Sequence, residues 1–249
     1  MESEKKTKTR RSVPIFRWII IIGIPILLTL WTVRFLIAWN SPSFPELEYG
    51  RIESDQYGFS DDERIEFAEA TLEYLRQSDP AEDVIHMLED LRLPGSNQSL
   101  YNQREIGHMI DVKHLVDLFN QIFKVLGIFT LAGLIYLMAR SETRIDAYKA
   151  VMYGGLLTTG ILLVMVVLIL IAWSFVFVQF HELLFPPDTW TFAMSDSLIR
   201  LFPEQFWFDF GVLWTVGILV QGVILALVGY GLQRWELGRE KQVEESALE

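Results

Sequence analysis

The sequence predicts an all-α membrane protein built as a four-transmembrane-helix bundle. The chain of 249 residues is 51% hydrophobic and 21% charged, which is too apolar for an ordinary soluble domain and too charged for a protein buried wholly in lipid. Four apolar stretches are long enough to cross a hydrocarbon core of about 30 Å, which takes about 20 helical residues. Clusters of basic residues also separate these stretches in a regular order. The predicted spans are residues 13–39, 115–139, 151–178 and 210–232.

The first of these stretches, residues 13–39, is predicted to be a retained membrane anchor. It is longer than the apolar core of a usual signal peptide, and it carries Arg34 near its far end. No small-x-small cleavage motif follows it. We therefore expect it to stay in the protein as the first transmembrane helix.

Lysine and arginine residues predict the side of the membrane on which each connection lies. Basic clusters occur in the amino-terminal tail (1–12), in the connection 140–150 and in the carboxy-terminal tail (233–249). Because basic residues accumulate on the cytoplasmic side, both termini are predicted to be cytoplasmic. The segments 40–114 and 179–209 are then extracytoplasmic.

Segment 40–114 is predicted to be an acidic helical insertion. It contains 17 Asp and Glu residues against 6 Lys and Arg, a balance equal to the net charge of −11 for the whole chain. Such a surface would repel nucleic acid and anionic headgroups, so no nucleic-acid partner is expected. Ser60 with Glu63 forms a capping box for one helix, and Pro80 suits the first position of a second. A long helix should begin near Ser99 or Leu100 and continue unbroken into the second span.

Segment 179–209 is predicted to be an interfacial loop because it is unusually rich in phenylalanine and tryptophan. Pro186, Pro187 and Pro203 break it into short turns and helices. A loop that lines a lipid-access groove and an inert re-entrant cap would share this composition, and both readings stay open here.

Two of the four histidines, His108 and His181, are candidates for chemistry. Each lies where a span meets the outer water, and histidine exchanges a proton near neutral pH. On a helix, His108 shares one broad face with Tyr101, Glu105 and Asp111. A carboxylate on this face could orient the imidazole, as in a base held by an acid. The alternative is a solvated helix face without function.

No metal or other cofactor is expected. His114 lies some 120° around the predicted helix from His108, which is a poor arrangement for zinc. A weak copper or zinc site from His108, Asp111, His181 and the neighbouring Glu182 remains an alternative. There is no cysteine in the chain, which excludes disulfides, thiol nucleophiles and thiolate ligands.

Polar residues inside the spans form a second candidate feature. Asp117, Gln121 and Lys124 form a helical stripe that enters the second span. A charge two turns inside a membrane is costly unless it faces protein or water, so Gln121 and Lys124 are predicted to line a polar cavity. Arg34 either joins this cavity or extends to the headgroups.

The chain resembles the bacterial Lit family of lipoprotein intramolecular transacylases. The resemblance rests on EIGHMIDV before the second span and FHELLFPPDTWTFAMSDSLIRLFPEQFW between the third and fourth, within which HMxDV and FHxLLF stand in order. It implies a multi-pass enzyme of the bacterial cell membrane that acts at its extracytoplasmic face. Its partners would be a diacylated lipoprotein and membrane lipid.

The resemblance also implies a reaction and a site. The sn-2 acyl chain of an S-diacylglycerol-cysteine would move to the α-amino group of the same cysteine, with no cofactor. The two active-site histidines of the family fall on His108 and His181. His108, backed by Glu105 or Asp111, would deprotonate the amine, while His181 would stabilise the oxyanion or protonate the leaving glycerol oxygen. A different class of function is a non-enzymatic envelope protein, a transporter accessory or sensor, that binds a partner through its outer helices.

Overall fold

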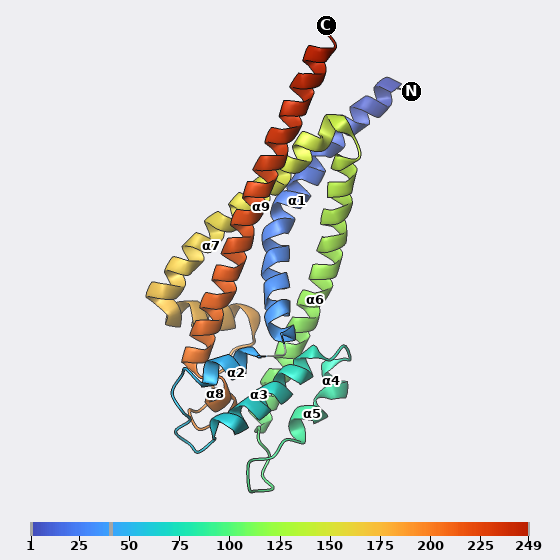
Figure 1. The fold of residues 1–249 in the computed structure, drawn as a ribbon. Helices are drawn as coiled ribbons and strands as arrows, with labels where there is room; N and C mark the ends of the chain where they lie inside the picture. The colour runs from blue at the N-terminus through green and yellow to red at the C-terminus, as the bar shows by residue number, and fades with distance from the viewer. Residues whose placement is uncertain (1, 40–41, 249) are drawn as a thin grey trace. The chain divides into compact units, whose positions relative to one another are not determined.

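The computed structural model describes residues 2–39 and 42–248, with side chains from residue 12 onward. Within these residues the regular secondary structure is helical, apart from one antiparallel bridge between Arg92 and Ser99 (Figure 1). The helices are α1 (Glu2–Ala38), α2 (Phe44–Tyr49), α3 (Asp61–Arg76), α4 (Ala81–Val84), α5 (His86–Glu89), α6 (Gln103–Met138), α7 (Ser141–Leu184), α8 (Ser197–Leu201) and α9 (Glu204–Ser246).

Four of these helices, α1, α6, α7 and α9, are long and apolar enough to cross a membrane. Each extends beyond the apolar stretch that predicted it: α7 begins at Ser141 and ends at Leu184, whereas its apolar stretch covers 151–178. A helix satisfies its own backbone hydrogen bonds, so it can continue into water once polar side chains replace apolar ones. Within α7, Ala172 has non-helical dihedral angles, with no proline or glycine within four residues of it.

The chain divides into two compact units, and the long helices contribute to both. The first unit comprises Met1–Thr32, Gln121–Val166 and Thr215–Glu249. The second comprises Val33–Asn120 and Val167–Trp214. The second unit therefore contains all the short helices and both candidate histidines.

In the first unit, α7 and α9 pack closely through small residues. A Cβ atom added to Gly155 would lie 2.5 Å from the backbone nitrogen of Ala226, and one added to Gly229 would lie 2.5 Å from the nitrogen of Met152. Only glycine permits such an approach of two helix backbones, as is common between membrane helices. Gln221 of α9, which the sequence places inside a span, donates a hydrogen bond to Thr32 of α1 at 2.9 Å.

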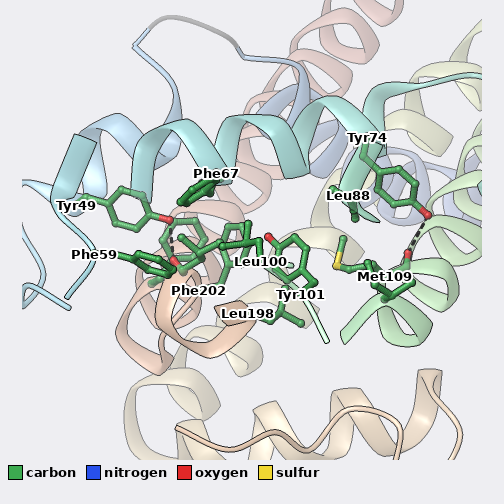
Figure 2. Close-up of a cluster of buried hydrophobic side chains, with 14 of the residues drawn as sticks. Tyr49, Phe59, Phe67, Tyr74, Leu88, Leu100, Tyr101, Met109, Leu198 and Phe202 are labelled. Atoms are coloured by element: carbon green, nitrogen blue, oxygen red, sulfur yellow. Dashed lines mark hydrogen bonds between the residues drawn. The ribbon is translucent and has the colours of Figure 1, made fainter. Parts of the chain in front are cut away.

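The second unit has a core in which α3 lies beside α5 and α8 (Figure 1). Its buried side chains come from α2 to α6, from α8 and from the start of α9. Figure 2 shows two tyrosines of this core whose hydroxyls bond to backbone carbonyls: Tyr49 donates to Leu201 at 2.6 Å, and Tyr74 donates to Met109 at 3.3 Å. These bonds satisfy polar groups that would otherwise be buried without partners.

The capping box predicted for α3 is present. Ser60 Oγ accepts a hydrogen bond from the backbone of Glu63 at 3.3 Å, and the Glu63 carboxylate accepts one from the backbone of Ser60 at 2.8 Å. The next helix, α4, begins at Ala81, because Pro80 takes the capping position just outside it. Helices α3 and α4 thus begin within one residue of their predicted starts, although Pro80 lies just before α4 and not at its first position.

Candidate functional site

Helix α6, which carries His108, begins later than the sequence suggested. Asn102 caps it: its side-chain oxygen accepts hydrogen bonds from the backbone of Arg104 at 3.0 Å and of Glu105 at 3.1 Å. Glu105 accepts one from the backbone nitrogen of Asn102 at 2.7 Å, which completes a capping box. The helix therefore starts at Gln103 rather than near Ser99 or Leu100, and it continues unbroken to its end at Met138.

This start corrects the predicted role of Tyr101. Tyr101 lies before the cap, so it does not share a helix face with His108. Its ring is buried in the core of the second unit (Figure 2). Its hydroxyl is 2.7 Å from the hydroxyl of Thr71 on α3. Tyr101 thus joins the loop before α6 to α3.

Glu105 lies on the predicted face but bonds to the backbone and not to His108. One carboxylate oxygen caps α6, and the other accepts a hydrogen bond from the backbone nitrogen of Leu198 in α8 at 2.6 Å. The side chain is only 1% exposed. Glu105 therefore ties the starts of two helices together, and both of its oxygens are occupied by amides.

The structure brings His108 of α6 and His181 of α7 together. Their ring centres are 6.5 Å apart, and the ring planes are inclined by 27°. Phe185 contacts both, with its ring centre 4.9 Å from that of His108 and 5.6 Å from that of His181. The two histidines, separated by 73 positions in the sequence, therefore share one aromatic environment.

Hydrogen bonding distinguishes the two imidazoles. His181 Nδ1 is 2.7 Å from the carbonyl oxygen of Phe177, one turn earlier in α7. Because a carbonyl only accepts, Nδ1 carries the hydrogen, and in the neutral ring Nε2 then offers the free lone pair. His108 is 7% exposed, and its buried Nδ1 has no hydrogen-bond partner among the described residues.

Aromatic rings from the loop after α7 cover the pair. Trp190 lies 4.9 Å from His181 and Phe192 lies 5.4 Å from His108, measured between ring centres. Phe177 packs against His181 from within α7 at 4.2 Å. The sequence predicted an aromatic interfacial loop but could not indicate which rings would reach the histidines.

The other supporting candidates do not contact the pair through hydrogen bonds. Asp111 is half-buried on α6 and makes no hydrogen bond to His108. Glu182 is exposed and accepts a hydrogen bond from Gln179 at 2.7 Å. Among the described residues no group of three or more His, Asp or Glu side chains is arranged to hold a metal ion, so the alternative copper or zinc set is not assembled.

The polar residues predicted inside the spans lie in different surroundings. Gln121 and Lys124 are exposed on α6, and the polar cavity that they are predicted to line stays a prediction. Arg34 is half-buried and donates a hydrogen bond to Asn120 of α6.

An ion pair that the sequence reading missed lies one turn before Gln121. Lys113 is fully buried, and its ammonium lies 2.7 Å from both carboxylate oxygens of Asp117. The spacing of four positions on one helix was a signal for it.

The comparison with protein families decides the assignment. The model of the family described as lipoprotein intramolecular transacylase Lit matches residues 16–207, a range that includes both histidines. The chain belongs to the Lit family. This Lit-family chain is a multi-pass integral membrane protein, and it belongs among the membrane transacylases for lipoproteins.

Individual proteins are similar to this chain in sequence or in fold. An uncharacterized protein from Aquifex aeolicus (strain VF5) is 27% identical over 191 residues, which cover 76% of this chain and 82% of that protein. The in meso structure of the lipoprotein intramolecular transacylase Lit from Bacillus cereus is similar with a TM-score of 0.71 at 20% identity, covering 93% of this chain and 99% of the other. A variant of that protein with a histidine-to-arginine substitution gives a TM-score of 0.66 at 18% identity, covering 98% and 100%. The predicted all-helical architecture with four long apolar helices is thereby confirmed.

Proposed function

We propose that this chain moves the sn-2 acyl chain of an S-diacylglycerol-cysteine lipoprotein to the α-amino group of the same cysteine. The product is an N-acyl, S-monoacylglycerol lipoprotein. The observation that carries the proposal is the pair His108 and His181, held in one aromatic environment with ring centres 6.5 Å apart. Two proton-handling groups at this separation can serve one acyl transfer, one at the attacking amine and the other at the oxygens of the ester.

The hydrogen bond from His181 to Phe177 favours His181 as the base. With Nδ1–H held by the carbonyl, Nε2 can take the proton from the amine as its nitrogen attacks the ester carbon. This reverses the roles that the sequence suggested, in which His108 was the base with a carboxylate behind it. Glu105 is occupied by two backbone amides, so it is not free to orient His108.

His108 then acts on the oxygen side of the reaction. Its ring N–H would donate a hydrogen bond to the tetrahedral oxyanion, or to the glycerol oxygen as the ester bond breaks. The proton taken from the amine returns to that glycerol oxygen, so one amide forms, one ester is lost and no proton is consumed. Donor and acceptor belong to one molecule, so the enzyme mainly holds them in attack geometry.

The aromatic rings around the pair support transfer to the amine over hydrolysis. Phe185, Trp190 and Phe192 lie beside the imidazoles, and apolar rings in these positions would limit the access of water to the reacting ester. Hydrogen bonds to a developing negative charge are also stronger in such a low-dielectric site. The basic clusters of the tails and of the connection between α6 and α7 support a site at the extracytoplasmic face.

The test is the chemical state of a reporter lipoprotein made in bacteria with and without this chain. Intramolecular transfer leaves the mass unchanged, so the amino terminus must be read by an amine-reactive mass tag followed by fragmentation. With the wild-type chain the terminal amine should be acylated and untagged. His108→Ala and His181→Ala should leave it free and tagged, while His86→Ala, at an exposed histidine of α5, serves as the matched control. Acylation that persists in both site variants would refute the proposal.

A further inference from the structure

Arg104 lies one turn before His108 on α6 and contacts the segment that covers both histidines. Its side chain is exposed, and its Nη2 donates a hydrogen bond to the backbone carbonyl of Thr191. The guanidinium carbon also lies 5.6 Å from the ring centre of Phe192. Arg104 therefore binds this segment by a charged hydrogen bond and by a cation–π contact.

We call residues 186–196 the aromatic strap. Thr191 stands between its two covering rings, Trp190 and Phe192, which lie 4.9 Å from His181 and 5.4 Å from His108. The carbonyl to which Arg104 donates therefore belongs to the residue between the two covering rings. One exposed arginine is thus linked to both imidazoles without touching either.

Other hydrogen bonds lie near the two ends of the aromatic strap. At its start, the backbone and hydroxyl of Thr189 donate to the carbonyl of Pro186 at 3.4 and 3.0 Å. At its end, Asp196 accepts from the backbone of Ala193 at 2.9 Å and from the side chain of Asn102 at 3.3 Å. Between them, in the part of the chain that the structure describes, only Arg104 forms a hydrogen bond with residues 190–192.

We propose that Arg104 is a positioning residue for the acyl transfer. It holds the aromatic strap against the histidine pair, so that the imidazoles keep their relative orientation and water stays out. The kinetic part of this inference rests on the proposed function, whereas the effect of Arg104 on access to the histidines does not depend on it.

The first experiment measures that access in the purified full-length protein. Diethyl pyrocarbonate acylates accessible histidines, and peptide mapping gives a separate rate for each one. Arg104→Ala should raise the rates at His108 and His181 by roughly tenfold, the loss expected for one charged hydrogen bond. The exposed His114 reports reagent activity in the same sample. The rates in Arg104→Lys should fall between those of the wild type and those of Arg104→Ala, because lysine can donate to the carbonyl but does not stack as arginine does.

A matched control is Arg92→Ala. Arg92 is also exposed and donates to backbone carbonyls, those of Glu89 and Leu91, so its loss removes similar bonds away from the aromatic strap. In Arg92→Ala, the reagent rates at His108 and His181 should stay at the wild-type level. Unchanged rates in Arg104→Ala would overturn the inference, whatever the outcome for acyl transfer.

The second experiment measures transfer kinetics on a synthetic diacylated lipopeptide. A positioning role predicts that Arg104→Ala lowers kcat by roughly tenfold with little change in KM, and that Arg104→Lys recovers part of it. Greater access to the histidines with an unchanged kcat would also overturn the positioning role. If the wild-type protein itself transfers no acyl chain, the proposed function fails, and the reagent rates still decide whether Arg104 holds the aromatic strap.

Discussion

Replacing Glu105 tests whether this buried carboxylate is a structural tie or a catalytic partner of His108. Its two oxygens accept backbone hydrogen bonds at 2.7 and 2.6 Å, one from the cap of α6 and one from the first turn of α8. Glu105→Gln keeps the size of the side chain, but an amide can accept through only one of its two ends. The other end would present an N–H group to a backbone N–H group.

The expected cost follows from the bond that is lost. A hydrogen bond to a charged group contributes about 1.5–3 kcal/mol, so one lost bond should speed local opening by roughly 10- to 150-fold. Glu105→Ala removes both bonds, so the rate of local opening should rise by more than this range. If glutamine keeps its oxygen toward α6, the change appears at the backbone amide of Leu198.

Hydrogen–deuterium exchange with mass spectrometry can check this in detergent-solubilised protein. The peptide that contains Leu198 should exchange faster in Glu105→Gln, and peptides from the far half of α9 should not change. Asp111→Asn is the matched control, because Asp111 lies on the same helix without a hydrogen bond to His108. The reasoning would be refuted if Glu105→Gln exchanged like the wild type while its acyl transfer was lost.

Three further sites yield separate predictions. Gly155→Ala should destabilise the first unit by about 1–3 kcal/mol and lower its thermal midpoint, because the added Cβ would lie 2.5 Å from a backbone nitrogen of α9. Gly160→Ala should not lower the midpoint, because a Cβ added there would meet no atom of a neighbouring element within 4 Å. Burial raises the pKa of Glu48 from 4.5 to about 7, with smaller contributions from a hydrogen bond and charge repulsion from Asp209. The stability that the protonated carboxyl contributes is therefore present below pH 4.5 and should be lost as the pH rises through 7. Glu48→Gln should remove this pH dependence from the melting curves. Asp188 has a φ of +66°, so Asp188→Val should cost about 1–2 kcal/mol and raise the reactivity of His181, whereas Asp188→Gly should not.

Local sequence signals predicted most of the secondary structure. The apolar stretches, the capping box at Ser60 and the proline before α4 depend on residues within a few positions of one another. The start of α6 was also encoded locally, in Asn102 and Glu105, but reading Glu105 as a partner of His108 hid it. Arguments from a shared helix face can say which residues are neighbours, but not which group each one binds.

The site shows the same limit. The sequence indicated His108 and His181 as a pair from their position relative to the spans, and the structure brings them together. It did not indicate Phe185, Trp190 or Phe192, because one aromatic residue in an interfacial loop resembles another until the loop is packed.

By itself, the sequence determined the all-helical architecture, the four apolar helices and the two histidines on which the proposed chemistry depends. The helices follow from composition and from periodicity along the chain, whereas the two histidines follow from their place at the ends of spans and from the resemblance to the Lit family. Only the tertiary structure decided that Glu105 bonds to the amide of Leu198 and that the hydrogen on His181 Nδ1 faces Phe177. It also decided that Arg104 holds the backbone between the two covering rings. Glu105 and Arg104 contact groups about 90 positions away, and the hydrogen bond of His181 depends on a rotamer set by packing, so no local pattern encodes them.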